Sequence, residues 1–182
     1  MPSQDEREIF ELLGRIAAQW NDIEEQWYSI FGSLMPPMPW RVLEAIYNQF
    51  QTGAMKRQLV LAVGDASLSK DHPTLREEMG RLYAKTNNLA GDRNAVVHSV
   101  YGDKRGKLRA VRPKSRHKPF RLANKDLLNE FVRVLADIQT LDSELWQLSR
   151  ELAVIRERRH ALSRKLFREY LDTVAPRQNP ED

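Results

Sequence analysis

Residues 127–166, LLNEFVRVLADIQTLDSELWQLSRELAVIRERRHALSRKL, repeat an apolar side chain at alternating steps of three and four. This heptad spacing predicts one long α-helix with a single apolar face, and Asn124 is expected to cap its start. At ~1.5 Å per residue, a helix of about 40 residues would span roughly 65 Å, which is longer than a domain of this size needs. We therefore expect the helix either to break near Arg159–His160 or to lean on another chain at its far end. The stripe consists of Leu127, Phe131, Val134, Ile138, Leu141, Leu145, Leu148, Leu152, Ile155, Leu162 and Leu166, with Arg159 as its polar exception.

A second stripe of the same kind runs through residues 5–34 and predicts a partner helix, which the prolines of residues 35–39 should end. Shorter helices are expected over 40–50 and 54–68, and a fourth begins after Asp71-His72-Pro73, where Asp can cap and Pro suits the first turn. We predict an all-α bundle of five to six helices, with long antiparallel helices, in a single domain over residues 1–175. More than half of the chain should be helical. The stripe of residues 5–34 consists of Leu12, Leu13, Ile16, Trp20, Ile23, Trp27, Ile30 and Leu34.

The fourth helix carries an unusual polar group in GDRNAVVHSVYG, residues 91–102. Its apolar stripe occupies positions 75, 79, 82, 86, 89, 93, 96 and 100, so Arg93 stands where packing favours an apolar residue. Asn94 and His98 are four residues apart and are therefore neighbours on a helix. A guanidinium can grip phosphate at two points, and an imidazole titrates near neutral pH. These groups could perform metal-free cleavage of RNA, and because one histidine makes only one proton transfer at a time, a symmetric dimer would supply the other.

The simpler alternative is that Arg93 and His98 are internal polar groups bonded to Asp92 or Glu78. Spacing alone favours this alternative, because an arginine and a histidine separated by four residues form a short pattern with many accidental matches.

A family resemblance favours the catalytic interpretation. In an all-helical bundle, the segment RNAVVH at residues 93–98 resembles the signature of the HEPN superfamily, which is Arg, four to six residues, then His, often with Asn, Asp or His directly after the Arg. The resemblance extends over the helix order of residues 5–160. It implies a dimeric, metal-independent ribonuclease of toxin–antitoxin or other defence systems, with Arg93 and His98 catalytic, Asn94 assisting and no cofactor. Ser99 stands where many relatives have glycine.

A basic segment follows directly, in residues 103–121. It carries a net charge of +8 in a chain whose total is +4, so the remainder is mildly acidic, at −4. Such a patch attracts phosphate backbones or acidic surfaces, and we expect a loop or hairpin over 103–123 that binds RNA. Leu108–Val111 and Phe120–Leu122 are expected to form short strands around it. The basic residues are Lys104, Arg105, Lys107, Arg109, Arg112, Lys114, Arg116, Lys118 and Arg121.

Composition excludes several classes of protein. The chain of 182 residues has no cysteine, so it has neither disulfides nor thiolate metal sites. Its other histidines, His72, His117 and His160, lack ligand spacing, so we expect no metal site. The start, MPSQDERE, is not expected to be a signal peptide, no apolar run approaches the length of a membrane span, and residues 176–182 are expected to be a disordered tail.

We therefore expect a cytoplasmic protein that cleaves RNA as a homodimer. Two alternatives stay open. One is a non-catalytic helical module that binds a nucleotide or an RNA end, and the other is an interaction protein whose basic element docks an acidic partner such as an antitoxin.

Overall fold

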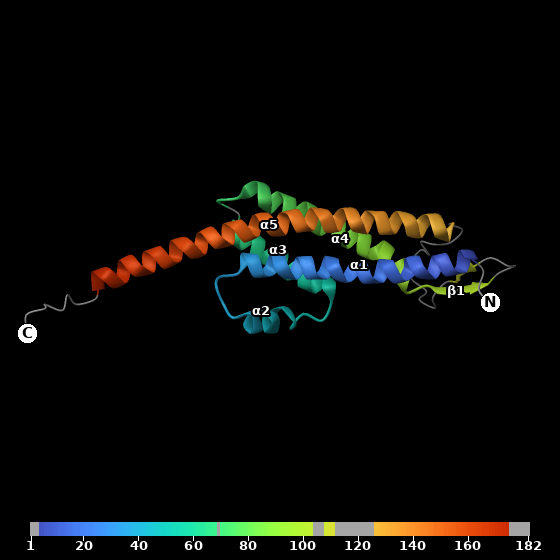
Figure 1. The fold of residues 1–182 in the computed structure, drawn as a ribbon, viewed down its shortest axis with the longest axis horizontal. Coiled ribbons are helices and arrows are strands. Elements are labelled where there is room, and N and C mark those ends of the chain that lie inside the picture. Colours follow the sequence, from blue (N-terminus) through green and yellow to red (C-terminus); the bar gives the residue numbers. More distant parts are fainter. Residues whose placement is uncertain (1–3, 69, 104–107, 112–125, 175–182) are drawn as a thin grey trace, which may run out of the picture.

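The computed structural model describes residues 4–68, 70–103, 108–111 and 126–174 (Figure 1). The prediction of an all-α bundle is confirmed, because five helices hold more than half of the chain and the strands of the described part form only a two-stranded hairpin. The elements are α1 Gln4–Leu34, α2 Trp40–Tyr47, α3 Gly53–Leu68, α4 Pro73–Val97, β1 Val100–Asp103, β2 Leu108–Val111 and α5 Leu127–Val174.

The two longest helices, α1 and α5, lie side by side and run in the same direction, and α4 runs antiparallel to both (Figure 1). Ser29 of α1 and Ser149 of α5 share a hydrogen bond between their hydroxyls at 2.9 Å. The antiparallel packing expected between long helices is therefore the packing of α4 against this parallel pair. A parallel pair is possible because α2, α3, α4 and the hairpin all intervene between α1 and α5 along the chain.

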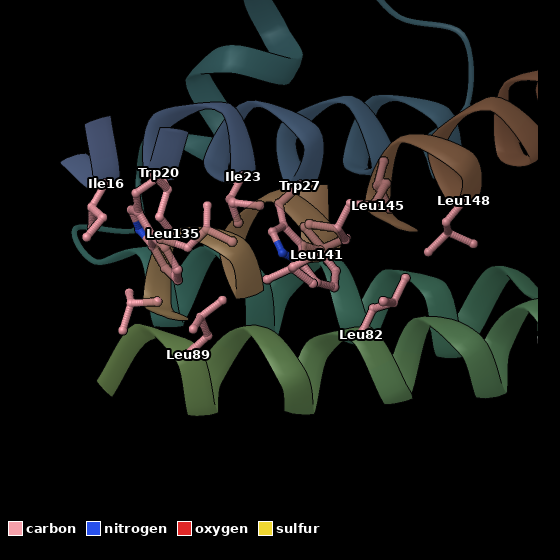
Figure 2. Close-up of a cluster of buried hydrophobic side chains, with 14 of the residues drawn as sticks. Ile16, Trp20, Ile23, Trp27, Leu82, Leu89, Leu135, Leu141, Leu145 and Leu148 are labelled. Carbon is pink, nitrogen blue, oxygen red and sulfur yellow. The ribbon is translucent and has the colours of Figure 1, made fainter. Parts of the chain in front are cut away.

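The core lies between α1, α4 and α5, where the predicted stripes meet (Figure 2). Trp27, Phe31 and Phe131 are among the largest fully buried side chains. The polar stripe member Thr86 is also fully buried, and its hydroxyl donates to the Leu82 carbonyl at 2.8 Å and accepts from the Trp27 indole at 3.2 Å. Both of its hydrogen-bonding roles are filled, so Thr86 does not leave an unsatisfied group in the core.

Helix α3 packs closely on α4 at Gly64. A Cβ at this position would lie 1.8 Å from Cε and 2.6 Å from Sδ of the fully buried Met79. Any side chain at residue 64 would displace Met79, so the glycine permits the close approach of the two helices.

Three helix boundaries differ from the prediction. The N-cap of α4 is His72 rather than Asp71, and it makes no side-chain capping bond. The N-terminus of α5 is capped by Asp126 rather than Asn124, because Asp126 Oδ1 accepts from the amides of Leu128 and Asn129 at 3.1 and 3.3 Å. Asp and Asn cap equally well, so composition could not choose between them. The short second helix ends at Tyr47, three residues before the predicted Phe50.

Helix α4 ends at Val97, before the last stripe position Val100, because side chains beyond it bind its last carbonyls. Ser99 Oγ donates to the Ala95 carbonyl and Tyr101 Oη donates to the Val96 carbonyl. Bonds of this kind satisfy acceptors that a helix C-terminus leaves free. Ser99 therefore lies outside the helix and helps to close it, and Val100 begins β1.

The hairpin confirms the strand Leu108–Val111 but not its expected neighbour. That strand, β2, pairs antiparallel with β1, with Val100 opposite Val111 and Gly102 opposite Arg109. The sheet therefore starts three residues before residue 103. Phe120–Leu122 and the tail 176–182 lie outside the described residues.

Helix α5 does not break at Arg159–His160. It continues unbroken through 48 residues, about 72 Å at ~1.5 Å per residue. Arg159, the polar exception in the stripe, donates from Nη2 to the Ser67 carbonyl at 3.0 Å and so binds the last turn of α3.

Beyond Arg159, α5 projects past the bundle (Figure 1). The stripe is buried from Leu127 to Leu152, but the large apolar side chains of the projecting part are about half exposed. They are Leu162, Leu166, Phe167, Tyr170 and Leu171. Within the described ranges, no helix has an apolar stretch long enough to cross a membrane.

Candidate functional site

Arg93 lies against α1, as its position in the stripe predicts. Its guanidinium carbon is 5.8 Å from the centre of the Trp20 ring, within the range of a cation–π contact. Nη1 donates to Oδ1 of the adjacent Asn94 at 3.0 Å, whereas Nε is buried and has no hydrogen-bond partner among the described residues. Burial lowers the pKa of Arg93, and the negative charge of Glu24 partly opposes that shift. The side chain is still a cation at neutral pH, because arginine starts from a value above 12.

Asn94 and His98 are both exposed at the C-terminal end of α4. His98 is the C-cap residue, and its amide donates to the Asn94 carbonyl at 3.0 Å. The structure therefore brings Arg93 and Asn94 into contact and places His98 one turn further on. An exposed imidazole can reach a ligand.

The internal partners that the simpler alternative assigned to Arg93 have other contacts. The Glu78 carboxylate accepts from Arg81 at 2.6 Å, and Asp92 accepts from Arg133 of α5 at 3.1 Å. Within the described ranges, Arg93 contacts Asn94 and the Trp20 ring.

A second polar cluster, not expected from the sequence, also contacts Trp20. Arg57 of α3 is only 3% exposed. Its Nη1 donates to Glu24 Oε1 at 2.6 Å, and its Nε and Nη2 both donate to Asn87 Oδ1 of α4, at 3.2 and 3.0 Å. The Trp20 indole also donates to Glu24 Oε1, at 3.2 Å. Nε, Nη1 and Nη2 of Arg57 therefore each have an acceptor, as a buried cation requires.

Trp20 thus contacts the arginines of two arginine–asparagine pairs. Arg57 lies 6.0 Å from its ring centre and Arg93 lies 5.8 Å from it. Their partners, Asn87 and Asn94, are seven residues apart on α4, which is about two helical turns. One signal could have revealed the first pair, since Arg57 shares a three-and-four spacing with the other buried residues of α3. Those residues are Val60, Gly64 and Leu68.

Most of the predicted RNA-binding residues lie outside the described part of the chain. Arg109 is the exception, in β2 opposite Gly102, close along the chain to the end of α4. The others are Lys104, Arg105, Lys107, Arg112, Lys114, Arg116, Lys118 and Arg121.

Within the described ranges, no three His, Cys, Asp or Glu side chains are grouped closely enough to hold a metal ion. Comparison of the chain with protein-family models, with curated proteins and with solved structures found no match.

Proposed function

We propose that the protein is a metal-independent endoribonuclease that cleaves RNA with Arg93, Asn94 and His98. The observation that carries this proposal is the end of α4, where an exposed histidine lies one turn from a partly exposed arginine. Asn94 and Trp20 hold the guanidinium, so its position is set before a ligand arrives. Pre-positioned donors are what stabilises a charged transition state most effectively.

In the proposed reaction, His98 takes the proton from a ribose 2′-hydroxyl, and the freed oxygen attacks the adjacent phosphorus. The bond from phosphorus to the 5′-oxygen of the next nucleotide breaks, and that oxygen receives a proton. Arg93 stabilises the negative charge of the pentacovalent intermediate. The products are a 2′,3′-cyclic phosphate and a 5′-hydroxyl, and no metal is needed.

A homodimer is part of this proposal, because His98 can serve as the base or the acid but not both at once. The hairpin end of the bundle, where α4 finishes, would then face its copy. Sedimentation equilibrium at the concentrations used for cleavage tests this part. A chain that cleaves RNA as a monomer would contradict the composite site.

The decisive experiment compares His98→Ala with His72→Ala on a labelled single-stranded RNA in EDTA. Loss of a general acid or base typically slows a reaction by about 100- to 10,000-fold, so His98→Ala should nearly abolish cleavage and still bind RNA. His72, at the opposite end of α4, is the matched control and should keep wild-type activity. A DNA strand of the same sequence should not be cut, because it has no 2′-hydroxyl. If purified His98→Ala cuts RNA as fast as wild type, the proposal is wrong.

The basic segment is proposed to hold the RNA. For single strands, the logarithm of the binding constant should fall with the logarithm of salt at a slope of about −0.7 per phosphate contact. Replacing Lys104, Arg105, Lys107 and Arg109 with alanine should flatten the slope and leave helicity unchanged. Binding that does not change with salt would contradict this role and would mean that the segment is an ordinary solvated surface.

The second candidate is a non-catalytic module that uses the same residues to bind a nucleotide, an RNA end or an acidic protein. The partial burial of Arg93 favours it, because a guanidinium stacked on Trp20 is less free to meet a moving phosphate. The projecting part of α5 favours a protein partner, since residues 156–168 hold six Arg and Lys against one Glu beside a bare apolar stripe. RNA that binds to both wild type and His98→Ala, and is cut by neither, would select this candidate.

A further inference from the structure

A hollow of about 490 Å³ opens between α1, α2 and the start of α3. Its size is within the range of small-molecule sites, which is roughly 300–1,000 Å³. It is lined by three glutamates, three aromatic residues and one lysine, together with Asn48, Gln51 and Gly53. The residues that argue for a ligand are Glu25, Tyr28, Trp40, Glu44, Tyr47 and Lys56.

The hollow has an excess of negative charge. Glu24 is paired with Arg57, whereas neither Glu25 nor Glu44 forms an ion pair with any residue in the described ranges. The only cation on the walls, Lys56, donates to Asn48 Oδ1 at 3.0 Å rather than to a carboxylate. Burial raises the pKa of the Tyr28 phenol, and the negative charges of Glu44 and Glu25 raise it further.

The aromatic side of the hollow already holds an ammonium group. Lys56 Nζ is 4.9 Å from the centre of the Tyr47 ring, which in turn contacts the Tyr28 ring at 5.0 Å. Trp40 stands at the rim and is 63% exposed. Ring faces next to carboxylates are the usual environment for organic cations.

Two further features mark the walls of the hollow. Tyr47 is only 5% exposed, yet its hydroxyl has no hydrogen-bond partner in the described part of the chain. At Gly53, a Cβ would lie 2.6 Å from Glu24 Oε1 and 2.9 Å from Arg57 Nη1, so any other residue would press on the buried ion pair. A buried unpaired hydroxyl is a rare feature that a bound group would resolve.

We propose that this hollow binds a small molecule bearing one alkylammonium or alkylguanidinium group, with its cation at Glu25 and Glu44 and its alkyl chain against Trp40 and Tyr28. The same charges repel phosphate, so the site is separate from the proposed RNA site at the end of α4. The proposal therefore stands or falls independently of ribonuclease activity.

The test is a titration of the full-length, ¹⁵N-labelled protein with butylguanidinium, followed by NMR. Butylurea is the control ligand, since it has nearly the same shape and no charge. Butylguanidinium should shift the Trp40 indole and the amides around Glu44, and butylurea should not. Equal binding of both compounds would overturn the proposal.

Three variants test the walls of the hollow. Glu25→Gln with Glu44→Gln should weaken binding by about tenfold, because each exposed charge contributes modestly. Lys56→Met should strengthen binding severalfold, since it removes the competing ammonium and keeps the alkyl chain, and a gain of this kind cannot arise from unfolding. Glu151→Gln, on the exposed side of α5, should change nothing. Wild-type affinity in a folded Glu25/Glu44 double variant would also overturn the proposal.

Discussion

Two arginines contact the same tryptophan and have opposite environments. Arg57 is almost fully buried, and Glu24 and Asn87 accept its hydrogen bonds. Arg93 is only partly buried, bonds to Asn94, and keeps Nε without a partner in the described part of the chain. The first arrangement is complete within the fold, whereas the second leaves one buried donor unpaired among the described residues and part of the guanidinium side chain exposed.

The two environments separate a cation that stabilises the fold from one that the proposed reaction would use. Removing one partner of a buried ion pair strongly destabilises the folded protein, because the remaining charge is left without compensation. Removing a partly exposed arginine should lower the free energy of unfolding only slightly, because water can solvate the polar groups that it leaves behind. Stability and RNA chemistry should therefore depend on different members of the two pairs.

The largest effect should come from Arg57→Ala. It leaves the Glu24 carboxylate without its cation and Asn87 Oδ1 without donors, so the free energy of unfolding should fall by about 3 kcal/mol. The lower end of the usual range applies because the Glu24 side chain is 28% exposed. Urea denaturation followed by circular dichroism measures this loss. Arg93→Ala is the matched control and should lose less than about 1 kcal/mol. Equal losses would erase the distinction between the two arginines.

The next effect concerns Arg93→Lys and appears in activity rather than stability. An ammonium cannot reproduce the planar two-point grip on a phosphate, so RNA cleavage should slow by about 100-fold. Single-turnover cleavage at saturating RNA isolates this step from binding. The unfolding midpoint should stay at the wild-type value. An Arg93→Lys variant that cleaves at the wild-type rate would remove Arg93 from the reaction.

The two asparagines should show the same contrast in the free energy of unfolding, but a smaller one. Asn87→Ala leaves buried donors of Arg57 without an acceptor and should lower the free energy of unfolding by about 1–2 kcal/mol. Asn94 is exposed, so Asn94→Ala should change it by less than about 0.5 kcal/mol and reduce cleavage only mildly. Thermal unfolding of both variants in one buffer makes the comparison. A larger loss for Asn94 would mean that the end of α4 is structural.

The smallest effect on stability should appear at high pH and should come from Tyr101, whose hydroxyl donates to the Val96 carbonyl at the end of α4. Burial raises the pKa of Tyr101 from 10.0 to about 12. The folded state therefore holds this proton more tightly than the unfolded chain, so the stabilisation is complete below pH 10 and is lost as the pH rises toward 12. Tyr101→Phe should show a shallower loss of stability than wild type in urea titrations above pH 10. Parallel pH profiles for the two proteins would show that Tyr101 does not contribute to the loss of stability above pH 10.

Periodicity predicted the helices well because their stripes are long. Arg93 was identified because it interrupts a stripe of apolar residues on α4. Arg57 was missed because the buried side of α3 is not a stripe of apolar residues: it includes a glycine and the arginine itself beside Val60 and Leu68. A buried cation is visible in sequence only if its carboxylate is known, and Glu24 lies 33 residues away on another helix.

Local contacts decided the remaining differences. The end of α4 depends on Ser99 and Tyr101 reaching back to carbonyls, and the edge of Tyr101 also packs on Phe131 at 5.8 Å. No helical period contains that information. The partner of β2 depends on the chain leaving α4 in an extended form, which follows from the same contacts.

The projecting end of α5 has a consequence for amide hydrogen exchange. A free peptide of its length would be barely helical in water, but a helix that grows from an existing one needs no new nucleus. Its backbone hydrogen bonds should therefore form, but they should open with little input of free energy, and more easily with distance from Arg159, which donates a hydrogen bond to the end of α3. Exchange should accelerate turn by turn from Arg159 to Val174. A partner that covers Leu162 and Leu166 would remove this gradient, so the exchange profile of α5 reports whether the stripe is occupied.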